Sequence, residues 1–169
     1  MKPHPLAADL RPDRPAALGP VVEERRARVL LVDDTRGDVL LTRRWLGPEK
    51  SLDCDLITAA TVGEALEALH TVAAAGGAID LVMLDIGLPG DSGFAFLEKI
   101  RADPAFRRIP VIMCTGSAHD VDRRYATLLG VVGYLPKPLK VEALRAVVEQ
   151  LPLLTVVEGA SSRNRLLAV

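Results

Sequence analysis

The sequence predicts an α/β fold, a doubly wound five-stranded parallel sheet with helices on both faces. Five short apolar runs alternate along the chain with five segments of helical character. The runs are nearly continuous in apolar residues, as expected for strands that are buried on both faces. Right-handed crossovers place the intervening helices on either side of such a sheet. Polar residues follow most of the runs, where the carboxyl ends of parallel strands gather functional groups.

The first two strand and helix pairs occupy residues 27–77. ARVLLVDD (27–34) is a β-favouring run that ends in two acids, and the helical segment after it stops at Gly47-Pro48. DCDLITAA (53–60) repeats the pattern. The helix that follows has apolar residues at helical spacing and ends at Gly76-Gly77.

Three more pairs complete the predicted sheet. The third strand is DLVMLD (80–85), and its helix begins near Asp91 or Ser92, with Gly93 among the residues at core spacing. Ser117 and Asp120 predict a capped helix over about 118–129, because a residue of each type can satisfy the free amides of the first turn. The remaining elements are the strands IPVIMCT (109–115) and VVGYL (131–135) and a last amphipathic helix that Pro152 ends.

These limits divide the chain into a flexible leader at 1–26, one domain at 27–151 and a C-terminal extension at 152–169. The leader is rich in Pro, Ala and Arg and has no periodicity. It lacks the apolar core of a signal peptide, and no apolar run approaches the ~18 residues that span a bilayer. We therefore expect a cytoplasmic protein without membrane contact. A net charge of -1 with mixed signs gives no electrostatic reason for direct nucleic-acid binding.

The cysteines and histidines carry no predicted chemistry. Cys54 and Cys114 each lie in an apolar run and are expected to be small buried hydrophobic residues. The three histidines have no metal-ligand spacing.

Charged and polar residues stand at the ends of four of the five predicted strands. Asp33 and Asp34 follow the first, Asp85 the third, Thr115 the fourth and Lys137 the fifth. Three carboxylates in one pocket repel one another unless they share a cation, and oxygen ligands alone favour Mg²⁺ or Mn²⁺. Lysine and threonine can hold two further phosphoryl oxygens. The set therefore fits a phosphoryl group carried on an aspartate.

With these motifs the sequence resembles the receiver domain of two-component response regulators. The resemblance covers residues 27 to about 151 and depends on VLLVDD, LDIGLPGDSG, CTGS and GYLPKP in that order. The separations of 30 residues from Asp85 to Thr115 and 22 from Thr115 to Lys137 match the family. It implies a flavodoxin-like sheet with strand order 2-1-3-4-5.

The resemblance also implies a role for each site residue. Asp85 would be the phosphoacceptor, and Asp34, Asp85 and the backbone carbonyl of Gly87 would hold Mg²⁺, with Asp33 acting through a water. Thr115 would move toward the phosphoryl oxygen, Tyr134 would rotate with it, and Lys137, next to a cis Lys137-Pro138 bond, would pair with the phosphoryl group. Tyr134 has an alternative role as half-buried strand packing. Asp38 is expected to serve the first helical turn rather than the metal.

The predicted function is a stand-alone phosphorelay regulator without enzymatic turnover. It would take its phosphoryl group from a sensor histidine kinase or a phosphotransfer protein and switch a protein-binding surface. VDDTRGDVLLTRRWL further resembles single-domain regulators that are paired with phytochrome-type photosensory kinases. Two alternatives stay open, a Mg²⁺-dependent aspartyl-phosphate phosphatase and a degenerate receiver that only binds. Against the phosphatase, the acids in VDDTRGD are adjacent rather than alternating.

The extension contains an apolar, β-favouring run at residues 153–157, followed by SSRNR, which looks solvated. One interpretation is that the run folds back over its own domain. The other is that it contacts a second copy in a symmetric homodimer, and a homodimer is the state we expect.

Overall fold

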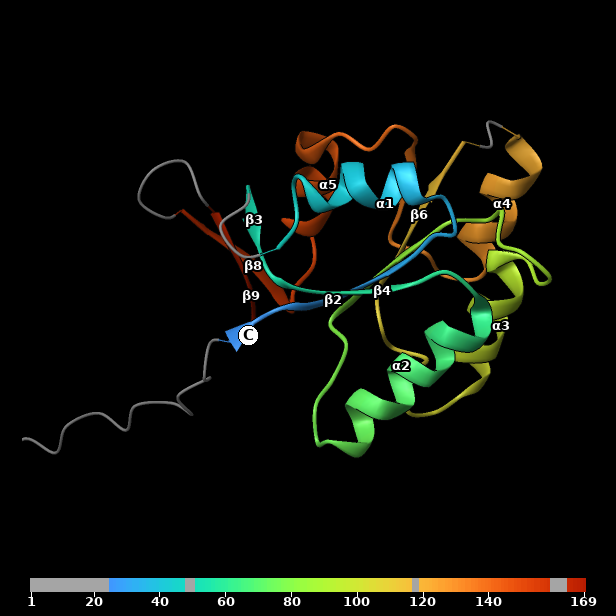
Figure 1. The fold of residues 1–169 in the computed structure, drawn as a ribbon, viewed down its shortest axis with the longest axis horizontal. Helices are drawn as coiled ribbons and strands as arrows, with labels where there is room; N and C mark the ends of the chain where they lie inside the picture. The colour runs from blue at the N-terminus through green and yellow to red at the C-terminus, as the bar shows by residue number, and fades with distance from the viewer. Residues whose placement is uncertain (1–24, 48–50, 117–118, 159–163) are drawn as a thin grey trace, which may run out of the picture.

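The computed structural model describes residues 25–47, 51–116, 119–158 and 164–169. A five-stranded sheet with the order β4-β2-β5-β6-β7 lies at its centre (Figure 1). This order confirms the predicted 2-1-3-4-5. All four pairings are parallel, as predicted. The strands are β2 (Arg28–Val32), β4 (Asp55–Ala59), β5 (Leu81–Leu84), β6 (Val111–Thr115) and β7 (Gly133–Pro136).

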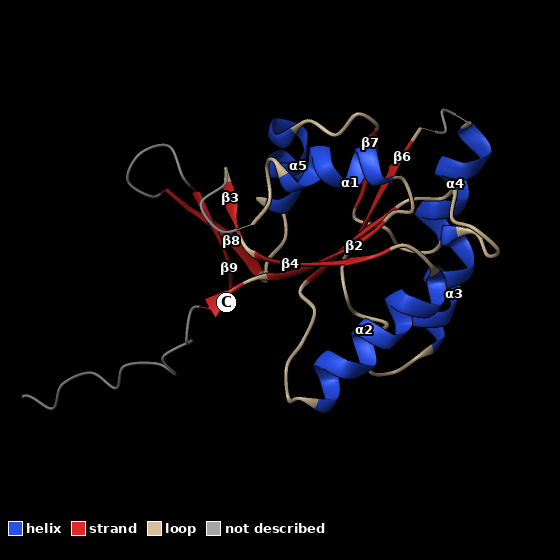
Figure 2. Cartoon of the chain, in the orientation of Figure 1, coloured by secondary structure: helices blue, strands red, loops and turns tan. Residues whose placement is uncertain are grey.

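The five helices of the described residues cover both faces of this sheet (Figure 2). One hydrophobic core contains side chains of α2, α3 and α4, and a second contains side chains of α1 and α5. The predicted doubly wound arrangement is therefore confirmed. The helices are α1 (Arg36–Arg43), α2 (Val62–Ala74), α3 (Gly93–Ala102), α4 (Asp120–Leu128) and α5 (Val141–Val148).

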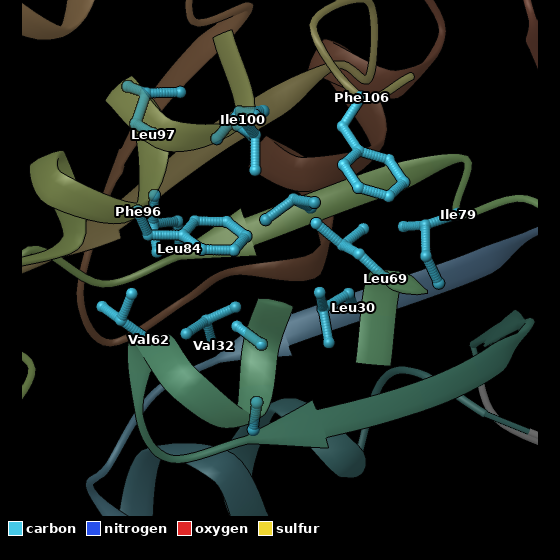
Figure 3. Close-up of a cluster of buried hydrophobic side chains, with 14 of the residues drawn as sticks. Leu30, Val32, Val62, Leu69, Ile79, Leu84, Phe96, Leu97, Ile100 and Phe106 are labelled. Carbon is cyan, nitrogen blue, oxygen red and sulfur yellow. The ribbon is translucent and has the colours of Figure 1, made fainter. Parts of the chain in front are cut away.

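The strands are apolar at nearly every position because alternate side chains enter the two cores. In β2, Val29 and Leu31 face the α1 and α5 side, whereas Leu30 and Val32 face the other side. Figure 3 shows Leu30 and Val32 near Phe96 and Leu69 of the flanking helices, and all four are essentially inaccessible to solvent. The two cores thus account for the apolar character of β2 on both of its faces.

The first turns of α2 and α4 are capped differently. The Thr61 hydroxyl accepts a hydrogen bond from the Glu64 amide, and the Glu64 carboxylate accepts one from the Ala60 amide, which satisfies two free donors reciprocally. The fourth helix was predicted over about 118–129, and α4 agrees with this range to within two residues. His119 is the N-cap residue and α4 begins at Asp120, while Ser117 lies outside the described residues.

A second, smaller sheet lies beside the main one and was not predicted. Its central strand is β9 (Asn164–Ala168), which pairs on one edge with β8 (Leu154–Glu158). The other edge pairs with β1 (Arg25–Arg26) and β3 (Leu52–Asp53). The apolar run of the extension therefore folds back within its own chain. Of the segment SSRNR only Asn164 and Arg165 are described. They begin β9, where Asn164 is half-buried and Arg165 is exposed.

The second sheet joins the domain through both backbone and side-chain contacts. Asp80 accepts two hydrogen bonds from the Arg25 guanidinium, at 2.7 and 2.8 Å, and one from the Arg28 amide at 2.7 Å. This bidentate pair fixes β1 against the start of β2. Leu52, Leu154 and Leu166 are buried in the core of the α1 and α5 face. Strand β1 lies within residues 1–26, which were predicted to be a flexible leader, so the ordered structure begins at least two residues earlier than predicted.

Among the described helices, none is both long enough and apolar enough to cross a membrane.

Candidate functional site

Three of the predicted carboxylates meet at the carboxyl edge of the central sheet. Asp33 follows β2, Asp85 follows β5, and both are buried, whereas Asp34 is exposed. The Asp33 amide donates to the Ala59 carbonyl and the Asp85 amide to the Val32 carbonyl, each at 2.9 Å. The sheet ladder therefore extends one residue beyond the strands and fixes both backbones. Carboxylate oxygens of the three residues lie within 4.8 Å of one another.

Lys137 enters this acidic group from the end of β7. Its Nζ lies 2.7 Å from Asp85 Oδ2, 2.8 Å from Asp33 Oδ2 and 2.9 Å from Asp38 Oδ2. Lys137 was predicted to pair with a phosphoryl group, and here its ammonium group pairs with three carboxylates. Asp38 stands in the first turn of α1 as expected, but its contact with Lys137 was missed, since an acid at that position is sufficiently explained by the helix dipole.

The burial of these charges changes their ionisation. Burial by itself lowers the pKa of Lys137, but hydrogen bonds to Asp33, Asp38 and Asp85 outweigh it and raise the pKa above its ordinary value. Burial raises the pKa of Asp33, and its hydrogen bonds from Lys137 and from the Thr35 amide only partly oppose this. Lys137 is therefore held as a full positive charge beside Asp85.

Thr115 and Tyr134 lie next to Lys137 on neighbouring strands. Thr115 ends β6, is buried, and its carbonyl accepts a hydrogen bond from the Lys137 amide at 3.1 Å. The Lys137-Pro138 bond is cis, as predicted. A cavity of about 260 Å³ opens between Thr115, Lys137, Tyr134 and the start of α4. Tyr134 is half-buried at the edge of the core, and Arg123 of α4 lies over its ring.

The loop after Asp85 holds α3 close against the site. The Gly87 amide lies 3.3 Å from Asp85 Oδ1, to which it donates, and the Gly93 amide donates to the Ile86 carbonyl at 2.8 Å. A Cβ on Gly93 would lie 2.0 Å from the Asp85 carbonyl oxygen. Gly93 was predicted only as a core position, and the glycine at the helix start is the signal that could have indicated this close approach.

The donor set fits a hard divalent cation. It consists of carboxylate oxygens, without sulfur or imidazole ligands within the described cluster, and Mg²⁺ and Mn²⁺ prefer oxygen ligands of this kind. Lys137 supplies a cation and Thr115 a hydroxyl at the same edge. A bound cation and Lys137 can offset the negative charge of a phosphoryl group, and a hydroxyl can donate a hydrogen bond to it.

The fold and this acidic edge define the class of protein, a flavodoxin-like α/β domain with an aspartate pocket at the carboxyl edge of its sheet. Residues 29–149 match the family described as the response regulator receiver domain. The chain belongs to that family.

Two curated relatives illustrate the family. The regulatory protein VanR of Enterococcus faecium is 31% identical over 138 residues, which are 81% of this chain and 55% of VanR. The cyclic di-GMP phosphodiesterase response regulator RpfG of Xanthomonas campestris is 37% identical over 84 residues, 50% of this chain and 22% of RpfG. The chain thus spans less than two thirds of the length of these relatives.

Three solved structures resemble the whole domain. The bacteriophytochrome response regulator AtBRR aligns with a TM-score of 0.69 and 27% identity over 80% of this chain and 99% of AtBRR. The Mn²⁺-bound form of the response regulator Rcp1 has a TM-score of 0.62 and 27% identity over 79% of this chain and 99% of Rcp1. The phosphorylated cyanobacterial phytochrome response regulator RcpA aligns with a TM-score of 0.63 and 26% identity over 73% of this chain and 89% of RcpA.

Proposed function

We propose that this receiver domain accepts a phosphoryl group on Asp85 from the phosphohistidine of a sensor histidine kinase or of a phosphotransfer protein. The observation that carries the proposal is the contact of 2.7 Å between Lys137 Nζ and Asp85 Oδ2 inside the acidic edge. Asp85 accepts hydrogen bonds from both Lys137 and the Gly87 amide of the following loop. These neighbours suit a group that becomes more negative when it is phosphorylated.

The transfer itself needs little from the protein beyond position and charge. A carboxylate oxygen of Asp85 forms a bond to phosphorus while the bond from phosphorus to the donor imidazole nitrogen breaks. The imidazole leaves with a proton from solvent. Lys137 and the Thr115 hydroxyl then hold phosphoryl oxygens, which replaces part of their hydration.

A divalent ion completes the proposed site. Asp34, Asp85 and the Gly87 carbonyl would hold Mg²⁺ or Mn²⁺, with Asp33 acting through a water, and the ion would share the negative charge of the phosphoryl oxygens. Support comes from the mutual approach of the three carboxylates within 4.8 Å. The Mn²⁺-bound relative Rcp1 supports the same choice of metal.

The partner and the output are further parts of the proposal. The relatives named as phytochrome response regulators favour a photosensory histidine kinase as the donor, acting in the cytoplasm. Phosphorylation would move Thr115 and Tyr134 and so change a protein-binding surface near α4. The domain would act as a carrier of the phosphoryl group and not as an enzyme with turnover.

Labelling by a small-molecule phosphodonor tests the proposal directly. The protein should gain one phosphoryl group in the presence of Mg²⁺, and Asp85→Asn should abolish the labelling. Asp91→Asn is the matched control, because Asp91 is an exposed acid near the site that pairs only with Lys99 among the described residues. Labelling of another residue, or equal labelling in EDTA, would contradict the assignment.

The same samples distinguish the carrier from the phosphatase alternative. A phosphatase would release phosphate from small phosphoesters in many turnovers, whereas a carrier releases at most about one equivalent per labelling cycle. Sustained release of phosphate that Asp85→Asn eliminates would make the protein an enzyme.

We also propose a homodimer that uses the outer edge of β8. Among the described strands, β8 pairs only with β9, and an open strand edge can pair with a second copy. Leu154 is buried and Val156 packs on the core, so Thr155 and Val157 point to the opposite face of the strand.

Sedimentation at micromolar concentration tests this association. Lysines at Thr155 and Val157 should shift the protein toward monomer while the core stays intact. Leu40→Lys, on the exposed side of α1 where Leu40 is 61% exposed, is the control for added charge. A monomeric wild-type protein, or an unchanged dimer in the double lysine variant, would end this part of the proposal.

A further inference from the structure

Arg123 makes a contact that nothing in the predicted site required. Its guanidinium carbon lies 5.1 Å from the centroid of the Tyr134 ring, within the range of a cation–π interaction. The Arg123 side chain forms no ion pair with any carboxylate of the described residues. The Tyr134 ring is therefore the charge-stabilising contact that the described residues provide for the Arg123 guanidinium.

The ring stands beside a space that it could enter. The cavity of about 260 Å³ has Tyr134 and Arg123 in its wall, together with Thr115 and Lys137 of the site. A water molecule occupies about 30 Å³, so the cavity is large enough for a side chain to move. Thr115 and the Tyr134 ring thus border the same cavity.

We propose that Arg123 is a positioning residue that holds Tyr134 in its present rotamer and so opposes the switch to the phosphorylated state. This inference depends on the proposed function. When Tyr134 rotates toward Thr115, its ring leaves the guanidinium and the cation–π contact is lost. The resting rotamer gains stability from that contact, whereas the rotated one does not, so Arg123 sets how readily the domain accepts the phosphoryl state.

The direction of the effect distinguishes this role from simple electrostatics. Removal of a positive charge near the site weakens the binding of an anionic phosphoryl group. Release of Tyr134 strengthens that binding, because a larger fraction of the protein already has the competent rotamer. The two explanations therefore predict changes of opposite sign for the same substitution.

Beryllium fluoride, added with Mg²⁺ as a phosphoryl mimic, is the probe. Calorimetric titration of the full chain should give an affinity for Arg123→Gln that is about two- to fivefold tighter than for the wild type, the ratio expected for one exposed cation–π contact. Arg123→Lys keeps a cation over the ring and should remain close to the wild type. Arg123 is exposed, so these variants are expected to fold.

Two matched controls isolate the contact. Arg124→Gln removes the same charge from the next residue of α4, which does not line the cavity, and should not tighten binding. In a Tyr134→Leu background, Arg123→Gln should have no effect, whereas in a Tyr134→Phe background, which keeps the ring, the gain should persist. This double-mutant cycle measures the interaction between Arg123 and Tyr134 separately from the effect of each substitution alone.

The outcomes separate the inference from the function on which it depends. If the wild type does not bind beryllium fluoride, or binds it equally well as Asp85→Asn, the proposed phosphoacceptor role fails. If the wild type binds but Arg123→Gln binds equally or more weakly, the positioning role of Arg123 is overturned. The same holds if Arg124→Gln gives an equal gain, or if the gain survives in Tyr134→Leu.

Discussion

The two ends of the central sheet are held together by different interactions. At the carboxyl end, Asp33, Asp85 and Lys137 form a compact group of charges with contacts of 2.7 to 2.8 Å. At the amino end, the second sheet is held by backbone ladders and by buried leucines such as Leu52 and Leu166. One strand joins the two regions, since Ala27 before β2 donates to the Leu166 carbonyl and Asp33 follows β2.

This difference separates function from stability within one small domain. Burying carboxylates beside one another costs free energy, and a lysine or a metal only partly offsets it. Burying leucines stabilises the folded state, and their side chains take no part in phosphoryl transfer. We therefore expect substitutions at the carboxyl end to change phosphorylation more than stability, and substitutions in the second sheet to do the reverse. Four predictions test this contrast.

The largest effect is expected in the second sheet. Leu166 is 1% exposed, and Leu166→Ala should lower the free energy of unfolding by about 2–5 kcal/mol, the range for a buried leucine. Leu128→Ala is the control, since Leu128 is 83% exposed. Urea unfolding gives the free energies. Labelling of Asp85, corrected for the folded fraction, should stay unchanged, and a further loss would show that the two ends are coupled.

The next largest effect is expected at the start of α3. Gly93→Ala places a Cβ against the Asp85 carbonyl oxygen, and such overpacking should cost about 1–3 kcal/mol. Labelling should also slow, because the shift displaces Asp85. Gly63→Ala, whose Cβ would meet only the Thr61 hydroxyl at 3.9 Å, should instead add a few tenths of a kcal/mol, as alanine favours helices. Equal effects of the two substitutions would refute the close approach.

A smaller change in free energy, with a clear functional result, is expected for Asp34→Ala. Affinity for Mg²⁺ should fall by about tenfold or more, whereas the free energy of unfolding without metal should stay equal or rise, because repulsion among the acids is relieved. A Mg²⁺ titration followed by urea unfolding in EDTA measures both quantities. Unchanged affinity would remove Asp34 from the metal site, and a large loss of stability would contradict the contrast between the two ends.

The smallest effect concerns the cysteines. Burial raises the pKa of the Cys54 and Cys114 thiols to about 12, so both are neutral at pH 8 and should react with thiol reagents far more slowly than in the unfolded chain. Cys54 lies directly after β3. In Leu166→Ala, opening of the second sheet should therefore speed labelling of Cys54 more than that of Cys114. Equal acceleration would indicate global rather than local unfolding.

The sequence by itself determined the five strand and helix pairs and the residues at the carboxyl edge. Four of the five apolar runs are followed by a charged or polar residue, and parallel strands bring such ends together. Asp33, Asp85, Thr115 and Lys137 could therefore be placed in one site from local signals alone. Strand order and the cis Lys137-Pro138 bond came from the family resemblance, and the structure agrees with both.

Only the tertiary structure decided the contacts that cross between distant segments. Strands β1 and β3 have two residues each, too few for any periodicity, and their common partner β9 lies more than a hundred positions away. The contacts of Asp38 with Lys137 and of Arg123 with Tyr134 likewise join a helix residue to a residue in or directly after β7. Such pairings leave no local pattern, because their free energy arises only when the packed sheet brings the two segments together.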